Sequence, residues 1–226
     1  MTTDGQDPGD VLSIQLLNVA AQQIGASLFQ VALVTSRGEI PGMLHPCEGG
    51  TGAVVWVSGA IGGLDGPANK LYARLGEALV AEGITSLRIT YRMPGELDEC
   101  VLDTLAGVSF LKGIGAERIA LVGHSFGGAV AISAGVVSDA VTAVAALSSQ
   151  TYGATGAGQL SPKPLLVIHG LDDTHLAASC SQMIYDWAQE PKKAVFYPGA
   201  GHGLRECAEE ATALMKEWLI AQAGAV

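Results

Sequence analysis

Hydrophobic and polar positions follow a blockwise pattern along most of the chain, and the blocks predict strands and helices in turn. Short β-branched runs, typical of strands buried on both faces, alternate with longer segments of helical periodicity. We expect strands near 53–58, 85–91, 118–123, 141–147, 164–169 and 194–197. We expect helices near 68–83, 96–113, 126–136, 178–189 and 204–222. Repeated strand–helix units indicate an α/β fold with a mostly parallel, doubly wound sheet and helices on both faces.

The first fifty residues depart from this alternation. Two apolar runs, Phe29–Thr35 and Glu39–Leu44, flank a short Ser-Arg-Gly segment, which predicts an antiparallel hairpin. Residues 11–26 are apolar and fit a helix or a strand equally well. Residues 1–10 are acidic and contain Gly and Pro, so we expect a mobile N-terminal tail before a single domain over 11–226.

Composition narrows the classes of partner. The 226 residues carry a formal net charge of −10, which argues against a nucleic-acid-binding protein. No apolar stretch approaches the roughly 20 residues of a membrane span, and the N-terminus has no signal-peptide pattern, so we expect a cytoplasmic protein without a membrane partner. The four cysteines show no C-x-x-C spacing, so neither a zinc site nor a disulfide framework is predicted. We also expect no cofactor.

The chemistry is indicated first by the segment Gly-His-Ser-Phe-Gly at 123–127. A β-branched run precedes it and a small-residue helical segment follows it, which is the context of a nucleophile elbow. In such a turn Ser125 is exposed at the end of a strand, and the backbone N–H of Phe126 points to the place where an oxyanion would form. The two glycines leave room where a Cβ would collide with a neighbouring element.

A serine nucleophile needs a base, and the base needs an acid to orient it. The segment His-Gly-Leu-Asp-Asp at 169–173 follows one predicted strand, and Gly-Ala-Gly-His-Gly at 199–203 follows the next. Both lie past the carboxyl ends of strands, where sites assemble in open α/β sheets. We therefore assign His202 as the base and consider both Asp172 and Asp173 as the acid. The other histidines fit the role of base less well: His175 is the nearest rival, followed by His169, His124 and His45.

These three motifs, in the order serine, acid, histidine, resemble those of the α/β-hydrolase superfamily. The resemblance extends from about residue 27 to the C-terminus and is closest to compact dienelactone-hydrolase-like proteins and small carboxylesterases. It implies Asp173 as the acid, since the superfamily pattern is H-G-x-x-D, and leaves Asp172 as a turn or capping residue. Dienelactone hydrolases proper use a cysteine nucleophile, so Ser125 favours esters over dienelactones.

The resemblance also predicts the rest of the site. The second oxyanion donor is expected in the loop after strand 53–58, at Ala60 or, alternatively, Ile61. The segment after strand 141–147 is too short for a cap domain, so the site should be open. Residues that flank the site loops are predicted to contact the substrate. They are Ile61, Tyr152, Leu176 and Leu204.

Together these features predict a serine hydrolase that cleaves small carboxylic esters with water through an acyl-enzyme intermediate. Lactone, dienelactone or thioester hydrolysis, or acyl transfer, are alternatives on the same fold. A non-catalytic ligand-binding descendant is a third hypothesis, against which the intact Ser125, Asp173 and His202 argue.

Overall fold

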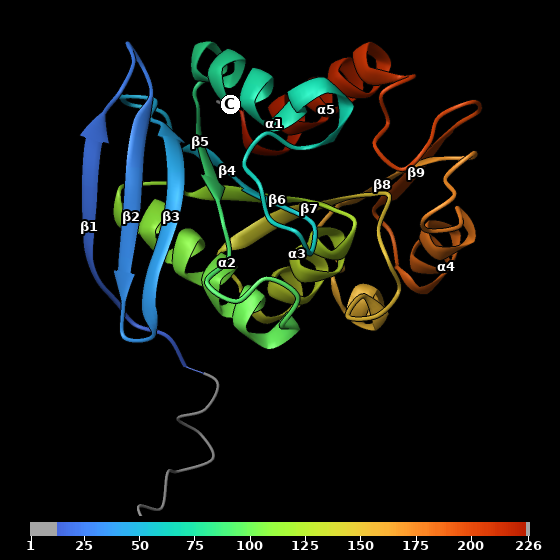
Figure 1. Ribbon diagram of the computed structural model, residues 1–226, viewed down its shortest axis with the longest axis horizontal. Coiled ribbons are helices and arrows are strands. Elements are labelled where there is room, and N and C mark those ends of the chain that lie inside the picture. The colour runs from blue at the N-terminus through green and yellow to red at the C-terminus, as the bar shows by residue number, and fades with distance from the viewer. Residues whose placement is uncertain (1–12, 225–226) are drawn as a thin grey trace, which may run out of the picture.

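The computed structural model describes residues 13–224, so the tail predicted for residues 1–10 lies outside the described part of the chain. The sheet has the strand order β1-β2-β3-β5-β4-β6-β7-β8-β9 (Figure 1). The strands are β1 Leu16–Gln23, β2 Phe29–Thr35, β3 Gly38–His45, β4 Gly52–Val57, β5 Ile84–Ile89, β6 Arg118–His124, β7 Val141–Leu147, β8 Leu165–Gly170 and β9 Lys192–Tyr197. The helices are α1 Pro67–Ala78, α2 Leu97–Gly113, α3 Phe126–Val137, α4 Ser179–Trp187 and α5 Ala208–Ala223, with short 3₁₀ helices η2 Leu79–Glu82 and η3 Thr155–Gln159.

The sheet combines a parallel and an antiparallel part. Strands β5, β4, β6, β7, β8 and β9 pair in parallel, whereas β1, β2 and β3 pair antiparallel and β3 joins them to β5. Figure 1 shows the antiparallel strands at one side of the molecule and the parallel strands between two layers of helices. The predicted α/β-hydrolase topology is confirmed: a mostly parallel sheet with an N-terminal antiparallel hairpin and helices on both faces.

Two separate cores lie on the two faces of the sheet. Helices α2, α3 and α4 cover one face, where Val55 and Val57 of β4 are buried, and α1 and α5 cover the other, where Val54 and Trp56 are buried. This division follows from the alternation of side chains along a strand. Because both faces are covered, the central strands β4, β5 and β8 are buried at every position.

The hairpin prediction is confirmed, since β2 pairs with β3 and Thr35 faces Gly38 across the turn. The ambiguous segment 11–26 contains strand β1, which pairs antiparallel with β2 and forms one edge of the sheet. Most side chains of β1 are exposed. The segment therefore lacks the buried apolar stripe that a helix packed against the core would have.

Two predicted helices have different limits in the structure, for backbone reasons. The helix predicted at 68–83 is divided into α1 and η2 and ends at Gly83, which has φ 78°. Its first turn is left-handed, with φ of 50°, 54° and 68° at Ala68, Asn69 and Lys70. The helix predicted at 204–222 begins only at Ala208, because Leu204 has φ 52° and forms a turn instead.

The segment between β7 and β8 holds only the short helix η3, so the described chain has no cap domain over the sheet. Within residues 13–224, no helix is both long enough and apolar enough to cross a membrane.

Candidate active site

The turn between β6 and α3 places Ser125 at the carboxyl end of the parallel sheet. Ser125 has φ 58° and ψ −121°, a conformation that L-residues rarely adopt. A Cβ on Gly123 would lie 1.9 Å from the carbonyl oxygen of Gly127, and a Cβ on Gly127 would lie 2.3 Å from that of Ser58. The strand, the turn and the helix therefore approach so closely that only glycine fits beside the serine, as the elbow motif predicts.

The structure brings Asp173 and His202 together from loops that follow different strands. Asp173, after β8, has a fully buried side chain, and its Oδ2 lies 2.7 Å from Nδ1 of His202, after β9. Its Oδ1 accepts the backbone N–H groups of His175 and Leu176 at 2.8 and 2.9 Å. Burial alone would raise the pKa of Asp173, but the hydrogen bonds from Leu176, His202 and His175 outweigh it and lower the pKa. The carboxyl group is therefore ionised at neutral pH.

Asp172 does not reach His202. Its side chain is exposed, and its backbone N–H donates to the carbonyl of Ala200 at 3.0 Å. Asp172 thus ties the loop after β8 to the loop that carries His202, while the next residue supplies the buried carboxylate. This is the arrangement that the H-G-x-x-D pattern implies.

The ring of His202 lies between two other imidazoles. The His175 ring stacks on it at 5.3 Å between centroids, and the His124 ring lies at 4.8 Å on a tilted plane. His124 Nε2–H also donates to the backbone carbonyl of His202 at 2.9 Å. His124 thus binds the backbone of the loop that carries His202. His45 lies elsewhere, beside Arg88.

In the described residues, no hydrogen bond joins Ser125 Oγ to His202. Catalytic hydrogen bonds commonly tighten only when substrate binds, so this geometry is compatible with Ser125 and His202 acting together. The backbone N–H of Ser125 donates to Leu147 O at 2.8 Å, which fixes the turn against β7.

The loop after β4 passes directly beside the serine. A side chain on Gly59 would lie 3.9 Å from Ser125 Oγ, and the next residues, Ala60 and Ile61, form a turn closed by a 3.0 Å bond from Gly62 N–H to Gly59 O. Phe126 opens α3, and the first N–H groups of a helix have no acceptor within it. The predicted oxyanion donors therefore lie on two segments that border Ser125.

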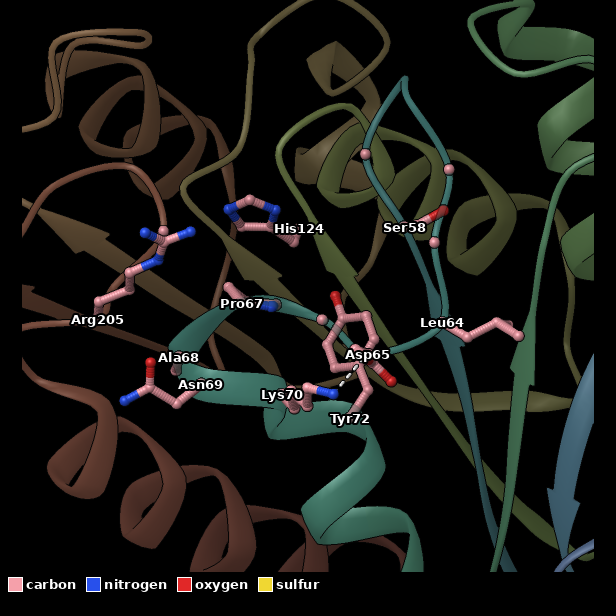
Figure 2. Close-up of a pocket in the computed structure, with 15 residues that line it drawn as sticks. Ser58, Leu64, Asp65, Pro67, Ala68, Asn69, Lys70, Tyr72, His124 and Arg205 are labelled. Carbon is pink, nitrogen blue, oxygen red and sulfur yellow. Dashed lines mark ion pairs between the residues drawn. The ribbon is translucent and has the colours of Figure 1, made fainter.

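A cavity of about 800 Å³ adjoins this site (Figure 2). His124 and Arg205 line one side, and Ser58 with the loop after β4 lines another. Gly203 also lines the cavity. The left-handed turn of α1 forms part of the wall, where Lys70 pairs with Asp65 at 3.2 Å. The sequence did not predict this wall, because a left-handed turn of three non-glycine residues has no sequence pattern.

The predicted substrate contacts are not among the residues that line this cavity, although Ile61 lies in the loop after β4 that borders it. Ile61 is fully exposed, Tyr152 is 72% exposed and Leu176 is half-buried, so all three are accessible on loops at the carboxyl edge of the sheet. Leu204 is a correction: it is completely buried among the residues of α1 and α5, where no substrate could touch it. Its positive φ turns the side chain into the core.

No group of three or more His, Cys, Asp or Glu side chains within residues 13–224 is arranged to hold a metal ion.

Comparison with known proteins places this chain in a family. The profile of the dienelactone hydrolase family matches residues 68–220, more than half of the chain, and the chain belongs to that family. A sequence comparison with curated proteins gives no significant match.

Solved structures share the fold. A dienelactone hydrolase from Anabaena variabilis is 18% identical, with a TM-score of 0.74, over 90% of this chain and 99% of that one. An esterase from Pyrococcus furiosus is 19% identical, with a TM-score of 0.72, over 99% and 96%. Est1E from Butyrivibrio proteoclasticus is 18% identical, with a TM-score of 0.71, over 81% and 94%. The chain thus has the α/β-hydrolase fold that these structures share.

The surroundings of His124 predict a pH dependence of stability. Burial lowers the pKa of His124 from 6.5 to about 4, so the unfolded chain takes up this proton at a higher pH than the folded one. The contribution to the free energy of unfolding is fully present above about pH 6.5 and is lost as the pH falls toward 4. We expect His124→Gln, which keeps an N–H donor but cannot titrate, to lose less stability than the wild type between pH 7 and 4.5. Urea unfolding at several pH values measures this, and parallel losses in the two proteins would contradict it.

Proposed function

We propose that this protein is a serine hydrolase that cleaves small carboxylic esters, with Ser125 as nucleophile, His202 as general base and Asp173 as the orienting acid. The observation that carries the proposal is the 2.7 Å contact between the buried Asp173 carboxylate and His202 Nδ1, beside the strained Ser125 turn. The three residues follow three parallel strands, β6, β8 and β9, at the carboxyl edge of the sheet, in the chain order that α/β-hydrolases use.

The proposed reaction begins when Ser125 Oγ attacks the ester carbonyl and His202 Nε2 takes its proton. Nδ1–H of His202 donates to Asp173, which fixes the tautomer and stabilises the imidazolium that forms. The carbonyl C–O bond to the alcohol then breaks, and His202 gives its proton to the leaving alcohol. Water, deprotonated by His202, attacks the acyl-enzyme, which releases the acid and restores Ser125.

Negative charge develops on the carbonyl oxygen during both steps. The backbone N–H groups of Phe126 and Ala60, with Ile61 as the alternative to Ala60, are proposed to bind this oxyanion. Both segments border Ser125, and such fixed donors stabilise the transition state without reorganisation.

Lactone hydrolysis is a second candidate, favoured by membership of the dienelactone hydrolase family. A lactone is a cyclic ester, and the same serine, histidine and oxyanion donors would open it. The difference is that the alcohol stays attached to the acyl group after ring opening. Parallel assays with p-nitrophenyl esters and γ-lactones, with the two kcat/KM values compared, separate the two candidates.

The test of the nucleophile is Ser125→Ala. We expect a folded protein whose esterase kcat is lower by on the order of 10⁴-fold or more, because removal of one member disables the whole triad. Wild-type protein should react covalently with a fluorophosphonate probe at Ser125, and the variant should not. If the variant keeps more than a tenth of the wild-type rate, Ser125 is not the nucleophile.

The two neighbouring aspartates provide a matched comparison. Asp173→Asn should lower kcat by on the order of 10³- to 10⁴-fold, because an amide cannot hold the same imidazole tautomer. Asp172→Asn removes the same charge one residue away, on an exposed side chain, and should change kcat by less than about twofold, since surface substitutions disturb little. Steady-state kinetics of both variants decide the assignment, and a larger loss at Asp172 would reverse it.

Without a cap domain, the described chain offers few apolar walls around the acyl group, and Ile61 and Tyr152 project into solvent. A buried CH₂ contributes about 0.8 kcal/mol only where a wall exists to bury it. We therefore expect kcat/KM to be highest for acyl chains of roughly two to six carbons, with ordinary saturation kinetics. A p-nitrophenyl ester series from acetate to palmitate measures this. A maximum at palmitate, or a jump in rate above the micelle concentration, would show an unrecognised cover.

A further inference from the structure

The carboxylate of Asp173 has a second histidine bound to it, which the proposed reaction does not use. We infer that His169 and Ser181 act as a positioning pair for Asp173, so that the site is a chain of four side chains, Ser181, His169, Asp173 and His202, with Ser125 at its end. This inference rests on the proposed function, because Asp173 is taken as the triad acid.

The fold places the ring of His169 between Ser181 and Asp173. It lies in β8 and, by strand alternation, on the same face as Val167, which packs in the core beneath α4. Its side chain is completely buried. Nδ1 lies 2.6 Å from Oγ of Ser181, on α4, while Nε2 lies 3.0 Å from Asp173 Oδ2 and 3.0 Å from Leu176 O.

These contacts determine the protonation of the ring. Both groups that face Nε2 of His169 are acceptors, so Nε2 must carry a hydrogen that it shares between Asp173 and Leu176 O. On a neutral ring Nδ1 is then an acceptor, and the hydroxyl of Ser181 donates to it. The opposite tautomer would direct the lone pair of Nε2 at the carboxylate. Ser181 therefore selects the tautomer that donates to Asp173.

The consequence for Asp173 is that every side of its carboxylate is held. Oδ2 accepts N–H groups from His202 and His169, and Oδ1 accepts those of His175 and Leu176. A carboxylate offers about four acceptor positions, so this one cannot rotate without losing a bond. His169 also shares the charge of Oδ2 and so weakens its hold on the imidazolium of His202.

Two other histidines, His124 and His175, lie beside the four linked side chains. His124 contacts His202 from β6, and its pKa of about 4 keeps it neutral in the assay range. His175 stacks on His202 from the loop after β8, is exposed, and is unchanged in every variant below. A shift in the pH–rate profile of a His169 or Ser181 variant therefore reports on the hydrogen bond between His169 and Asp173.

The experiment compares four variants of the full chain in ester hydrolysis. His169→Leu removes the donor, and His169→Gln keeps an N–H group at about the position of Nε2. Ser181→Ala removes the hydroxyl that selects the tautomer. Ser86→Ala is the matched control, because Ser86 is equally buried and its Oγ also lies 2.6 Å from a ring nitrogen, that of Trp56, outside the site.

For His169→Leu we expect kcat to fall about 10- to 100-fold with KM within twofold, since a hydrogen bond to a charged group is lost and no substrate contact changes. The midpoint of the acidic limb of kcat/KM should move to higher pH, because Oδ2 of Asp173 then binds His202 alone. His169→Gln should restore most of kcat and the wild-type midpoint. Ser181→Ala should lower kcat and raise the acidic midpoint, as His169→Leu does, but each by a smaller amount.

Ser86→Ala should lower the unfolding temperature as Ser181→Ala does, but leave kcat and the pH midpoint unchanged. The inference is overturned if folded His169→Leu has the wild-type kcat and acidic midpoint, or if Ser86→Ala and Ser181→Ala shift the profile equally. Either result, with an active wild type that reacts with fluorophosphonate at Ser125, leaves the proposed function intact.

The tautomer is measured without any reaction. In protein labelled with ¹⁵N-histidine, His169 should show the Nε2–H form at neutral pH, with its N–H proton at low field, and Ser181→Ala should broaden or shift that signal while Ser86→Ala does not. A His169 ring protonated on Nδ1 alone would overturn this inference, whether or not the wild type is active. An inactive wild type would instead refute the proposed function, so the two failures are distinguishable.

Discussion

The close approach of three backbone segments at the end of β6 is the constraint on which the site depends. Gly123, Gly127 and the carbonyl of Ser58 lie so near one another that a single added Cβ would overlap a backbone atom. Between the two glycines, Ser125 is held at a positive φ, a conformation that costs on the order of 1–3 kcal/mol and persists only where the surroundings impose it. The bonds from Ser125 N–H to Leu147 O and from Gly128 N–H to Ser125 O impose it here.

The same packing fixes the loop after β4, which borders Ser125. The Tyr72 hydroxyl donates to the carbonyl of Val57 and the Tyr91 hydroxyl to that of Ser58, each at 3.1 Å. Tyr72 belongs to the core on the α1 and α5 face, and Tyr91 to the core on the other face. Burial raises the pKa of both phenols, so both remain donors. Two consecutive peptides at the end of β4 are thus held from opposite sides of the sheet, and this orients the N–H groups that follow.

Much of this arrangement could be read from the sequence, because it depends on local patterns. Alternating β-branched runs predicted the parallel strands, and the hairpin of β2 and β3 follows from two apolar runs around Ser36 and Arg37. The elbow and the H-G-x-x-D segment pointed to Ser125 and Asp173, whose surroundings in the structure match those roles. The assignment of their catalytic roles remains a prediction that kinetics must test.

What could not be read depends on contacts between distant segments. The left-handed turn at 68–70 is bound to the loop of His202 through a 2.8 Å bond from Ala68 N–H to Gly203 O, and no local pattern encodes it. Leu204 sits at a site loop in the sequence, but its backbone turns it into the core. The contact between His169 and Ser181 also escaped prediction, since Ser181 belongs to a helix that carries no catalytic motif.

The charge that forms on His202 bears on the role of the histidines near it. Three of the five histidines of the chain, His124, His169 and His175, lie around the pair formed by Asp173 and His202, yet the proposed reaction requires only one imidazolium. His124 stays neutral because burial lowers its pKa, and it contributes an N–H donor without adding a charge. A lysine or arginine at these positions would also donate, but its permanent charge would oppose the formation of the His202 imidazolium. The neutral ring of His124 therefore supports His202 without opposing the charge that forms on it.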